Sequence, residues 1–230
     1  MSSLHPALLA DPGLRPDPSK MIRLMNGKKV DSTIVRETAA VIACGSGLPT
    51  SNAIYGFKSD EEFQSWCEGQ PIADSVYRAY RSVRELQDLE KGDLSRMETA
   101  CREASDAKAA ELQRLAKREG LKEDSRELFH LASGASGSAP TPSVLGFTIL
   151  YENVGFGGKV RPTPLTIPNL NWIGIDNQVS SMRGFGAGFL ADKTFFRGKK
   201  FFYFGIPSIE FDDLRLFDYD NLASSFYLFG

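Results

Sequence analysis

The sequence predicts an α+β protein, in which a mainly helical N-terminal region with a few short strands precedes an all-β region. Apolar residues recur at helical spacing through much of residues 59–131, whereas aromatic and β-branched runs separated by turn residues fill residues 147–230. A stretch of small residues and prolines without an apolar period lies between them. We therefore expect a flexible arm at 1–20, a mainly helical domain of unknown role at 21–131, a flexible linker at 132–146 and a β-sandwich at 147–230.

The N-terminal region is expected to begin with short strands. The Asn26-Gly27 dipeptide lies between Met21–Leu24 and Lys28–Val30 and suits the positive φ angles of a type I′ turn, which predicts a small hairpin over residues 21–30. Residues 38–44 and Ala53–Phe57 are further strand candidates.

Helices are expected to follow. Ser59 and Glu62 have the spacing of a capping box, which predicts a helix start. Helical patterns over 71–89 and 94–119 are joined by a short break, which favours a helical hairpin that packs internally or, as the alternative, against a partner helix. A short third segment, about 123–131, precedes the linker.

The C-terminal region contains an internal duplication. The hexapeptide DNQVSS at 176–181 returns as DNLASS at 220–225, and the segment from Leu150 to Gly158 recurs as Leu190 to Gly198. Two units of about forty residues therefore make up this region, and such units usually bury their apolar faces against each other.

These residues resemble the βγ-crystallin family, including its microbial members. The resemblance covers residues 147–230 and depends on Tyr151 with Gly158, on the IPNL run at 167–170, and on the two hexapeptides. It implies two four-stranded Greek keys packed as a double Greek-key β-sandwich. One position departs from the pattern, because the second unit has Ala191 where the first has Tyr151.

The resemblance also implies two calcium sites, because the hexapeptide is the calcium-binding motif of the family. Ca²⁺ takes six to eight oxygen ligands, and main-chain carbonyls serve as well as carboxylates. Each loop offers acid, amide and hydroxyl oxygens and the carbonyl of its third residue, and the family adds a hairpin carbonyl. The expected ligands are Glu152, Asp176, Asn177, Gln178, Ser180, Asp192, Asp220, Asn221, Leu222 and Ser224.

Each of these loops has a second serine, Ser181 or Ser225, which is expected to support the loop. The few formal charges at each site predict micromolar or weaker binding. The alternative is that the same side chains bond only the loop backbone, since Asp, Asn and Ser are common turn formers.

The sequence predicts a non-enzymatic, calcium-binding structural protein whose C-terminal region is stabilised by the ions. The Cys44-Gly45-Ser46-Gly47 run lacks the Lys-Ser/Thr of a phosphate loop, and no acid, base and nucleophile set is apparent, so no catalytic residue is expected. The alternative is that the β-sandwich is a recognition or delivery module, while the N-terminal helices bind a protein partner or form an effector domain.

Charge and hydropathy exclude other classes. The net charge of −2 gives no basic excess, so we expect no nucleic-acid partner. No apolar run approaches the length of a membrane span. The first residues lack the pattern of a secretory signal and the cysteine number is odd, so we expect reduced thiols and a cytoplasmic protein, with non-classical export as the alternative.

Overall fold

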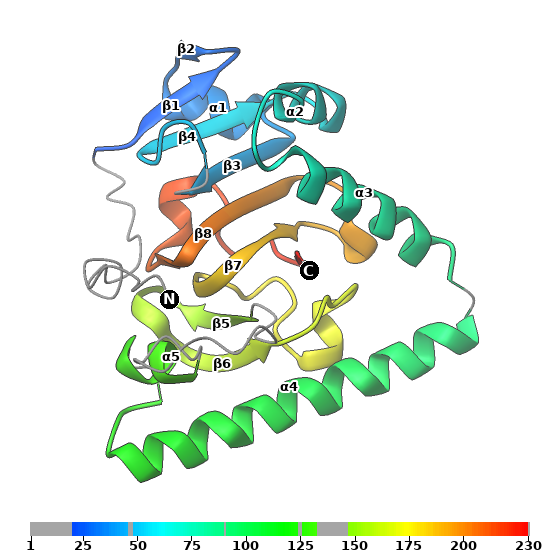
Figure 1. Cartoon of the computed structure of the whole chain (residues 1–230), viewed down its shortest axis with the longest axis vertical. Coiled ribbons are helices and arrows are strands. Elements are labelled where there is room, and N and C mark those ends of the chain that lie inside the picture. Colours follow the sequence, from blue (N-terminus) through cyan, green and yellow to red (C-terminus); the bar gives the residue numbers. More distant parts are fainter. Residues whose placement is uncertain (1–19, 46–47, 90, 124–125, 133–146, 230) are drawn as a thin grey trace, which may run out of the picture.

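The computed structural model describes residues 20–45, 48–89, 91–123, 126–132 and 147–229 (Figure 1). The expected arm at 1–20, except Lys20, and the expected linker at 132–146, except Ala132, lie outside the described residues. The strands are β1 (Ile22–Met25), β2 (Lys28–Lys29), β3 (Val41–Gly45), β4 (Ala53–Phe57), β5 (Phe147–Asn153), β6 (Gly157–Thr163), β7 (Ser181–Ala191), β8 (Lys200–Phe211) and β9 (Ser225–Leu228). The helices are α1 (Ser32–Thr38), α2 (Asp60–Cys67), α3 (Ala73–Gln87), α4 (Lys91–Glu119) and α5 (Arg126–Ala132), with short 3-10 turns η2 (Val154–Phe156), η3 (Leu170–Ile173), η4 (Thr194–Phe196) and η5 (Leu214–Phe217).

The N-terminal hairpin is confirmed, and one helix beside it was not expected. Asn26 and Gly27 have φ angles of 49° and 71°, as a type I′ turn requires. The strand expected over 38–44 instead begins at Val41, because α1 occupies Ser32–Thr38. Asp31 caps this helix by accepting a 2.8 Å bond from the Thr33 N–H.

Ser59 caps α2 as expected, although the return bond of the capping box goes to Lys58 instead of Ser59, and the expected helical hairpin does not form. The Glu62 N–H donates to Ser59 Oγ at 3.2 Å, and the Glu62 carboxylate accepts from the Lys58 N–H. Over their described residues, α3 packs against α2 and η4, whereas α4 packs along β6 and η3. Figure 1 shows the two long helices diverging from their joint to cover different parts of the sheet, so the hairpin prediction is wrong.

One mixed sheet joins the two regions. Among the described residues, nine strands pair in the order β2-β1-β4-β3-β8-β7-β5-β6, with β9 paired to β7 beside this path. β3 runs parallel to the first half of β8, with Val41 opposite Lys200 and Gly45 opposite Phe204. The sheet therefore crosses the boundary that the sequence places between residues 131 and 147.

Two long strands are shared between different neighbours. The start of β7 pairs with β5 and its end pairs with β9, while β8 follows β7 along its length with a register shift between Phe185 and Gly186. Ile167 forms an isolated antiparallel bridge with Phe226. The C-terminal region is thus built of β-strands joined by 3-10 turns, and the described residues together form an α+β protein.

The core is also common to both regions. Val41 of β3, Phe63 of α2 and Val76 of α3 are fully buried in one apolar cluster with Phe189 of β7 and Phe202 of β8. Burial of aromatic side chains is the dominant favourable term here. No described helix combines the length and the apolar character needed to cross a bilayer.

Candidate metal centre

Two hairpin turns, η2 after β5 and η4 after β7, lie next to the hexapeptide loops. The second serine of each hexapeptide holds one of these turns in place. Ser181 Oγ donates to the Asn153 carbonyl at 2.6 Å and accepts from the Phe156 N–H at 3.0 Å. Ser225 Oγ makes the equivalent bonds to the Lys193 carbonyl at 2.8 Å and the Phe196 N–H at 3.0 Å. Both serines are fully buried, as their expected supporting role requires.

The acidic residue of each hairpin uses its carboxylate within the hairpin. Glu152 Oε2 accepts from the Lys159 N–H at 3.0 Å, and Asp192 Oδ1 accepts from the Lys199 N–H at 2.8 Å. A carboxylate engaged in this way fixes the turn. The resemblance implies that Glu152 and Asp192 would offer an ion their main-chain carbonyls, which leaves these carboxylate bonds in place.

The two hexapeptide loops lie against each other. The Asn177 N–H donates to the Ala223 carbonyl at 2.8 Å, and the Asn221 N–H donates to the Val179 carbonyl at 3.0 Å. Asn177 and Asn221 have φ angles of 51° and 52°, a left-handed conformation that asparagine tolerates better than most residues. The duplication in the sequence is therefore also an approximate two-fold repeat in hydrogen bonding.

The side chains of the loops cross as well. Ser180 Oγ donates to Asn221 Oδ1 at 3.2 Å, and Ser224 Oγ donates to Asn177 Oδ1 at 3.3 Å. The sequence suggested that the acid, amide and hydroxyl of one loop act together. The structure instead joins the hydroxyl of one loop to the amide of the other.

Each crossed pair lies beside one hairpin. The Ser180 N–H donates to the Tyr151 carbonyl at 3.0 Å, next to Glu152, and the Ser224 N–H donates to the Ala191 carbonyl at 2.8 Å, next to Asp192. We call Glu152, Ser180 and Asn221 the first centre, and Asp192, Ser224 and Asn177 the second centre.

A buried carboxylate oxygen in each loop lacks a hydrogen-bond donor. In Asp176 and in Asp220, Oδ2 accepts from the side-chain amide of the following asparagine, at 3.2 and 3.1 Å, while Oδ1 is buried without a hydrogen bond. A buried oxygen left in this state is costly. A cation would satisfy it, so these residues fit a bound metal ion.

The third residue of each loop, Gln178 or Leu222, has an exposed side chain and can contribute only its carbonyl. Over the described residues, no group of three or more His, Cys, Asp or Glu side chains could hold a metal ion. The two loops present carboxylate, amide, hydroxyl and main-chain oxygens, and an all-oxygen donor set suits Ca²⁺ rather than a transition metal.

The second hairpin replaces the missing tyrosine with other rings. In the first hairpin, Tyr151 packs edge-on against Phe156 with centroids 5.4 Å apart. In the second, Ala191 is fully buried and Phe196 packs edge-on against Phe189 at 5.9 Å and Tyr227 at 5.7 Å.

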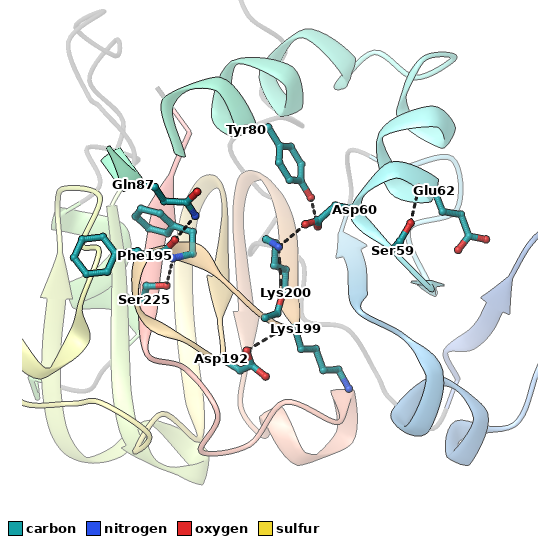
Figure 2. Close-up of polar contacts among 12 residues, drawn as sticks. Ser59, Asp60, Glu62, Tyr80, Gln87, Asp192, Phe195, Lys199, Lys200 and Ser225 are labelled. Atoms are coloured by element: carbon teal, nitrogen blue, oxygen red, sulfur yellow. Dashed lines mark hydrogen bonds and ion pairs between the residues drawn. The ribbon is translucent and has the colours of Figure 1, made fainter. Parts of the chain in front are cut away.

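A polar cluster beside the second hairpin had no sequence signal, because its members come from α2, α3 and β8 (Figure 2). The buried Lys200 Nζ lies 2.7 Å from Asp60 Oδ2, and the Tyr80 hydroxyl donates to Asp60 Oδ1 at 2.7 Å. Burial, with the charge of Asp60, raises the pKa of Tyr80. These residues line a cavity of about 350 Å³ between the helices and the hairpin.

Comparison with known proteins finds distant structural similarity only. No family model matches the chain, and no curated protein matches it. The chain is similar to an archaeal βγ-crystallin (22% identity, over 36% of this chain and 96% of that chain, TM-score 0.32) and to a βγ-crystallin from Ciona intestinalis (26%, over 36% and 98%, TM-score 0.32). It is also similar to spherulin 3A from Physarum polycephalum (19%, over 40% and 90%, TM-score 0.30). Similarity at this level does not place the chain in a family.

Proposed function

We propose that this protein is a non-enzymatic calcium-binding protein whose C-terminal region, a double Greek-key β-sandwich, is stabilised by two calcium ions. The observation that carries the proposal is the pair of buried Oδ1 atoms of Asp176 and Asp220, which lack donors inside loops rich in other oxygens. Calcium would supply the positive charge that these atoms need.

The centres would draw on both loops. Ser180 and Asn221 with the Glu152 carbonyl would serve the first centre, and Ser224 and Asn177 with the Asp192 carbonyl the second. The two aspartates and the carbonyls of the third loop residues would complete the sites: Asp176, Asp220, Gln178 and Leu222. Because each centre takes residues from both hexapeptides, a bound ion would hold the two repeats together.

Stabilisation follows from linkage. An ion that binds only the folded state, at a hundred times its Kd, adds about 2.7 kcal/mol to the free energy of unfolding. The strand pairing supports a structural role for the bound ions. The two loops end where β7 and β9 begin, and these two strands pair with each other.

We do not propose an independent effector role for the N-terminal helices, because β3 pairs with β8 and α2 and α3 share a core with β7 and β8. A cytoplasmic location belongs to the same proposal and is supported by Cys44, Cys67 and Cys101, which are free and buried.

Calorimetric titration of the full chain with calcium tests the proposal. We expect two binding events and a rise in Tm in millimolar calcium. Ser180→Ala with Ser224→Ala should abolish both. The matched controls, Gln178→Ala with Leu222→Ala, change the same loops but keep the carbonyls, so they should retain binding. Absence of heat and of any Tm shift would contradict calcium binding.

A further inference from the structure

We propose that Gln87 of α3 is a positioning residue for the second centre alone, so that the N-terminal region sets calcium affinity at one of the two centres. The inference rests on the proposed calcium function. The Gln87 side-chain amide donates to the Phe195 carbonyl at 2.7 Å, a bond between residues 108 positions apart (Figure 2).

The second hairpin needs this support because of its backbone. Phe195 has φ 57°, in the left-handed region that disfavours residues with a bulky side chain. The equivalent residue of the first hairpin is Gly155, with φ 69°, which adopts the same conformation without a Cβ penalty. Each hairpin also has a phenylalanine at positive φ in the next position, Phe156 at 66° and Phe196 at 61°. The second hairpin therefore has two strained residues where the first has one, and it is the hairpin that Gln87 contacts.

The strained turn connects directly to the second centre. Phe196 follows Phe195, and its N–H donates to Ser225 Oγ. Ser225 is adjacent to Ser224, whose N–H donates to the Ala191 carbonyl beside Asp192. A shift of the turn would therefore displace both the hydroxyl and the hairpin carbonyl expected to bind the ion.

The other end of the hairpin is held by the N-terminal region as well. Lys200 Nζ contacts both Asp60 of α2 and the Gly198 carbonyl, the latter at 3.3 Å. Lys199 precedes it and donates its N–H to Asp192 Oδ1, as Figure 2 shows. Lys200 is buried and Asp60 is half-buried, so the pair holds the Lys200 ammonium in place and the hairpin is supported at two points.

The first hairpin is held differently. The turn N–H bonds are alike, since Gly155 donates to the Asp212 carbonyl and Phe195 to the Pro168 carbonyl, both at 2.7 Å. The lysines differ, because Lys159 Nζ donates to the Gly174 carbonyl whereas Lys199 Nζ donates to the Arg36 carbonyl at 3.3 Å. Asp212 and Gly174 both belong to the C-terminal region. The first hairpin meets the N-terminal region through apolar packing, since Phe156 shares a cluster with Leu112 and Ala116 of α4. The second hairpin receives the Gln87 hydrogen bond and the Lys200–Asp60 ion pair beside it.

The test separates the centres in the full chain. Ser180→Ala leaves only the second centre, and Ser224→Ala leaves only the first. Gln87→Glu keeps the side-chain size but removes the donor. Calorimetry should show calcium affinity falling about three- to tenfold in the Ser180→Ala background, the range that follows from the loss of one hydrogen bond, and unchanged affinity in the Ser224→Ala background. Arg81→Ala, on an exposed part of α3, is the control and should change neither.

Two further measurements keep the outcomes distinct. Phe195→Gly removes the strained side chain, so it should restore affinity in the Gln87→Glu variant. Without calcium, Gln87→Glu should speed hydrogen exchange at the Phe196 amide more than at the Phe156 amide. An equal loss of calcium affinity in the Ser180→Ala and Ser224→Ala backgrounds, or no loss in either, would overturn the inference. If the unmodified protein binds no calcium, the proposed function fails, whereas the exchange result still decides whether Gln87 positions the hairpin.

Discussion

Ser180 Oγ donates a hydrogen bond to Asn221 Oδ1 at 3.2 Å across 41 positions of sequence. Its counterpart joins Ser224 to Asn177. The hydroxyl and amide oxygens that resemble one ligand set in each loop are therefore shared between the loops, and each proposed centre depends on both repeats.

This crossing predicts which substitutions act on the same centre. Ser180→Ala and Asn221→Ala should each remove the first centre, so the double variant should still bind one ion. Ser180→Ala with Asn177→Ala should remove both centres, although both residues lie in one loop. Calorimetric stoichiometry distinguishes these cases. One remaining ion in the Ser180/Asn177 variant would show that each loop builds its own site.

Gly198 is predicted to be essential to the second hairpin. Its φ is +71°, and an added Cβ would lie 1.8 Å from Asp192 Oδ1. Gly27 has the same φ and open space around an added Cβ, which makes it a matched control. Gly27→Ala should cost about 1–2 kcal/mol from backbone strain alone. Gly198→Ala should cost more and should weaken calcium binding at the second centre, as urea unfolding and calorimetry can measure. Equal losses of stability in the two variants would contradict the close packing of Gly198 against the Asp192 carboxylate.

Breaking the buried Arg183–Glu210 pair is predicted to destabilise the protein strongly. The Arg183 Nε lies 3.8 Å from Glu210 Oε2, both side chains are buried, and the guanidinium lies 3.9 Å from the centre of the Phe156 ring. Glu210→Ala should lower the free energy of unfolding by about 3–5 kcal/mol, because it leaves the arginine charge without its carboxylate. The exposed pair Arg81–Glu85 is the control, and Glu85→Ala should cost at most about 1 kcal/mol. Similar losses from the two variants would refute the prediction.

The three cysteines are predicted to be unreactive in the folded protein. Burial raises the pKa of Cys67 to about 12 and of Cys101 to about 11, and raises that of Cys44 as well. Near neutral pH almost no thiolate forms, so a thiol reagent should react slowly until denaturant is added. Rapid labelling of a native cysteine would show that its thiol is accessible.

Asp213 is predicted to contribute stability that is lost in acid. Hydrogen bonds from Arg215 lower the pKa of this carboxyl below its usual value of 3.8. A lowered folded-state pKa gives stability that is present above the unfolded value and disappears as the pH falls through the folded value. The Tm difference between the unmodified protein and Asp213→Asn, which keeps the cap but not the charge, should therefore be constant near neutral pH and vanish below pH 3.8. A difference that persisted in acid would exclude ionisation as its origin.

Several elements were predictable because their causes are local. The Asn26-Gly27 hairpin depends on two positive φ angles, and the start of α2 depends on bonds between residues three or four apart. The helix α1 was missed because Thr33, Ile34 and Val35 are β-branched and favour strands by propensity. Its Asp31 cap was the available signal.

The sequence alone determined the duplicated loops, their oxygen-rich chemistry and the positions of the local turns and caps, since each is set by neighbouring residues. Only the tertiary structure decided that the loops exchange partners, that α3 and α4 separate, and that Gln87 reaches Phe195. Those contacts join residues 41 to 108 positions apart or depend on which face of the sheet a helix covers. No local periodicity encodes such pairings, because they arise from the packing of the whole chain around one sheet.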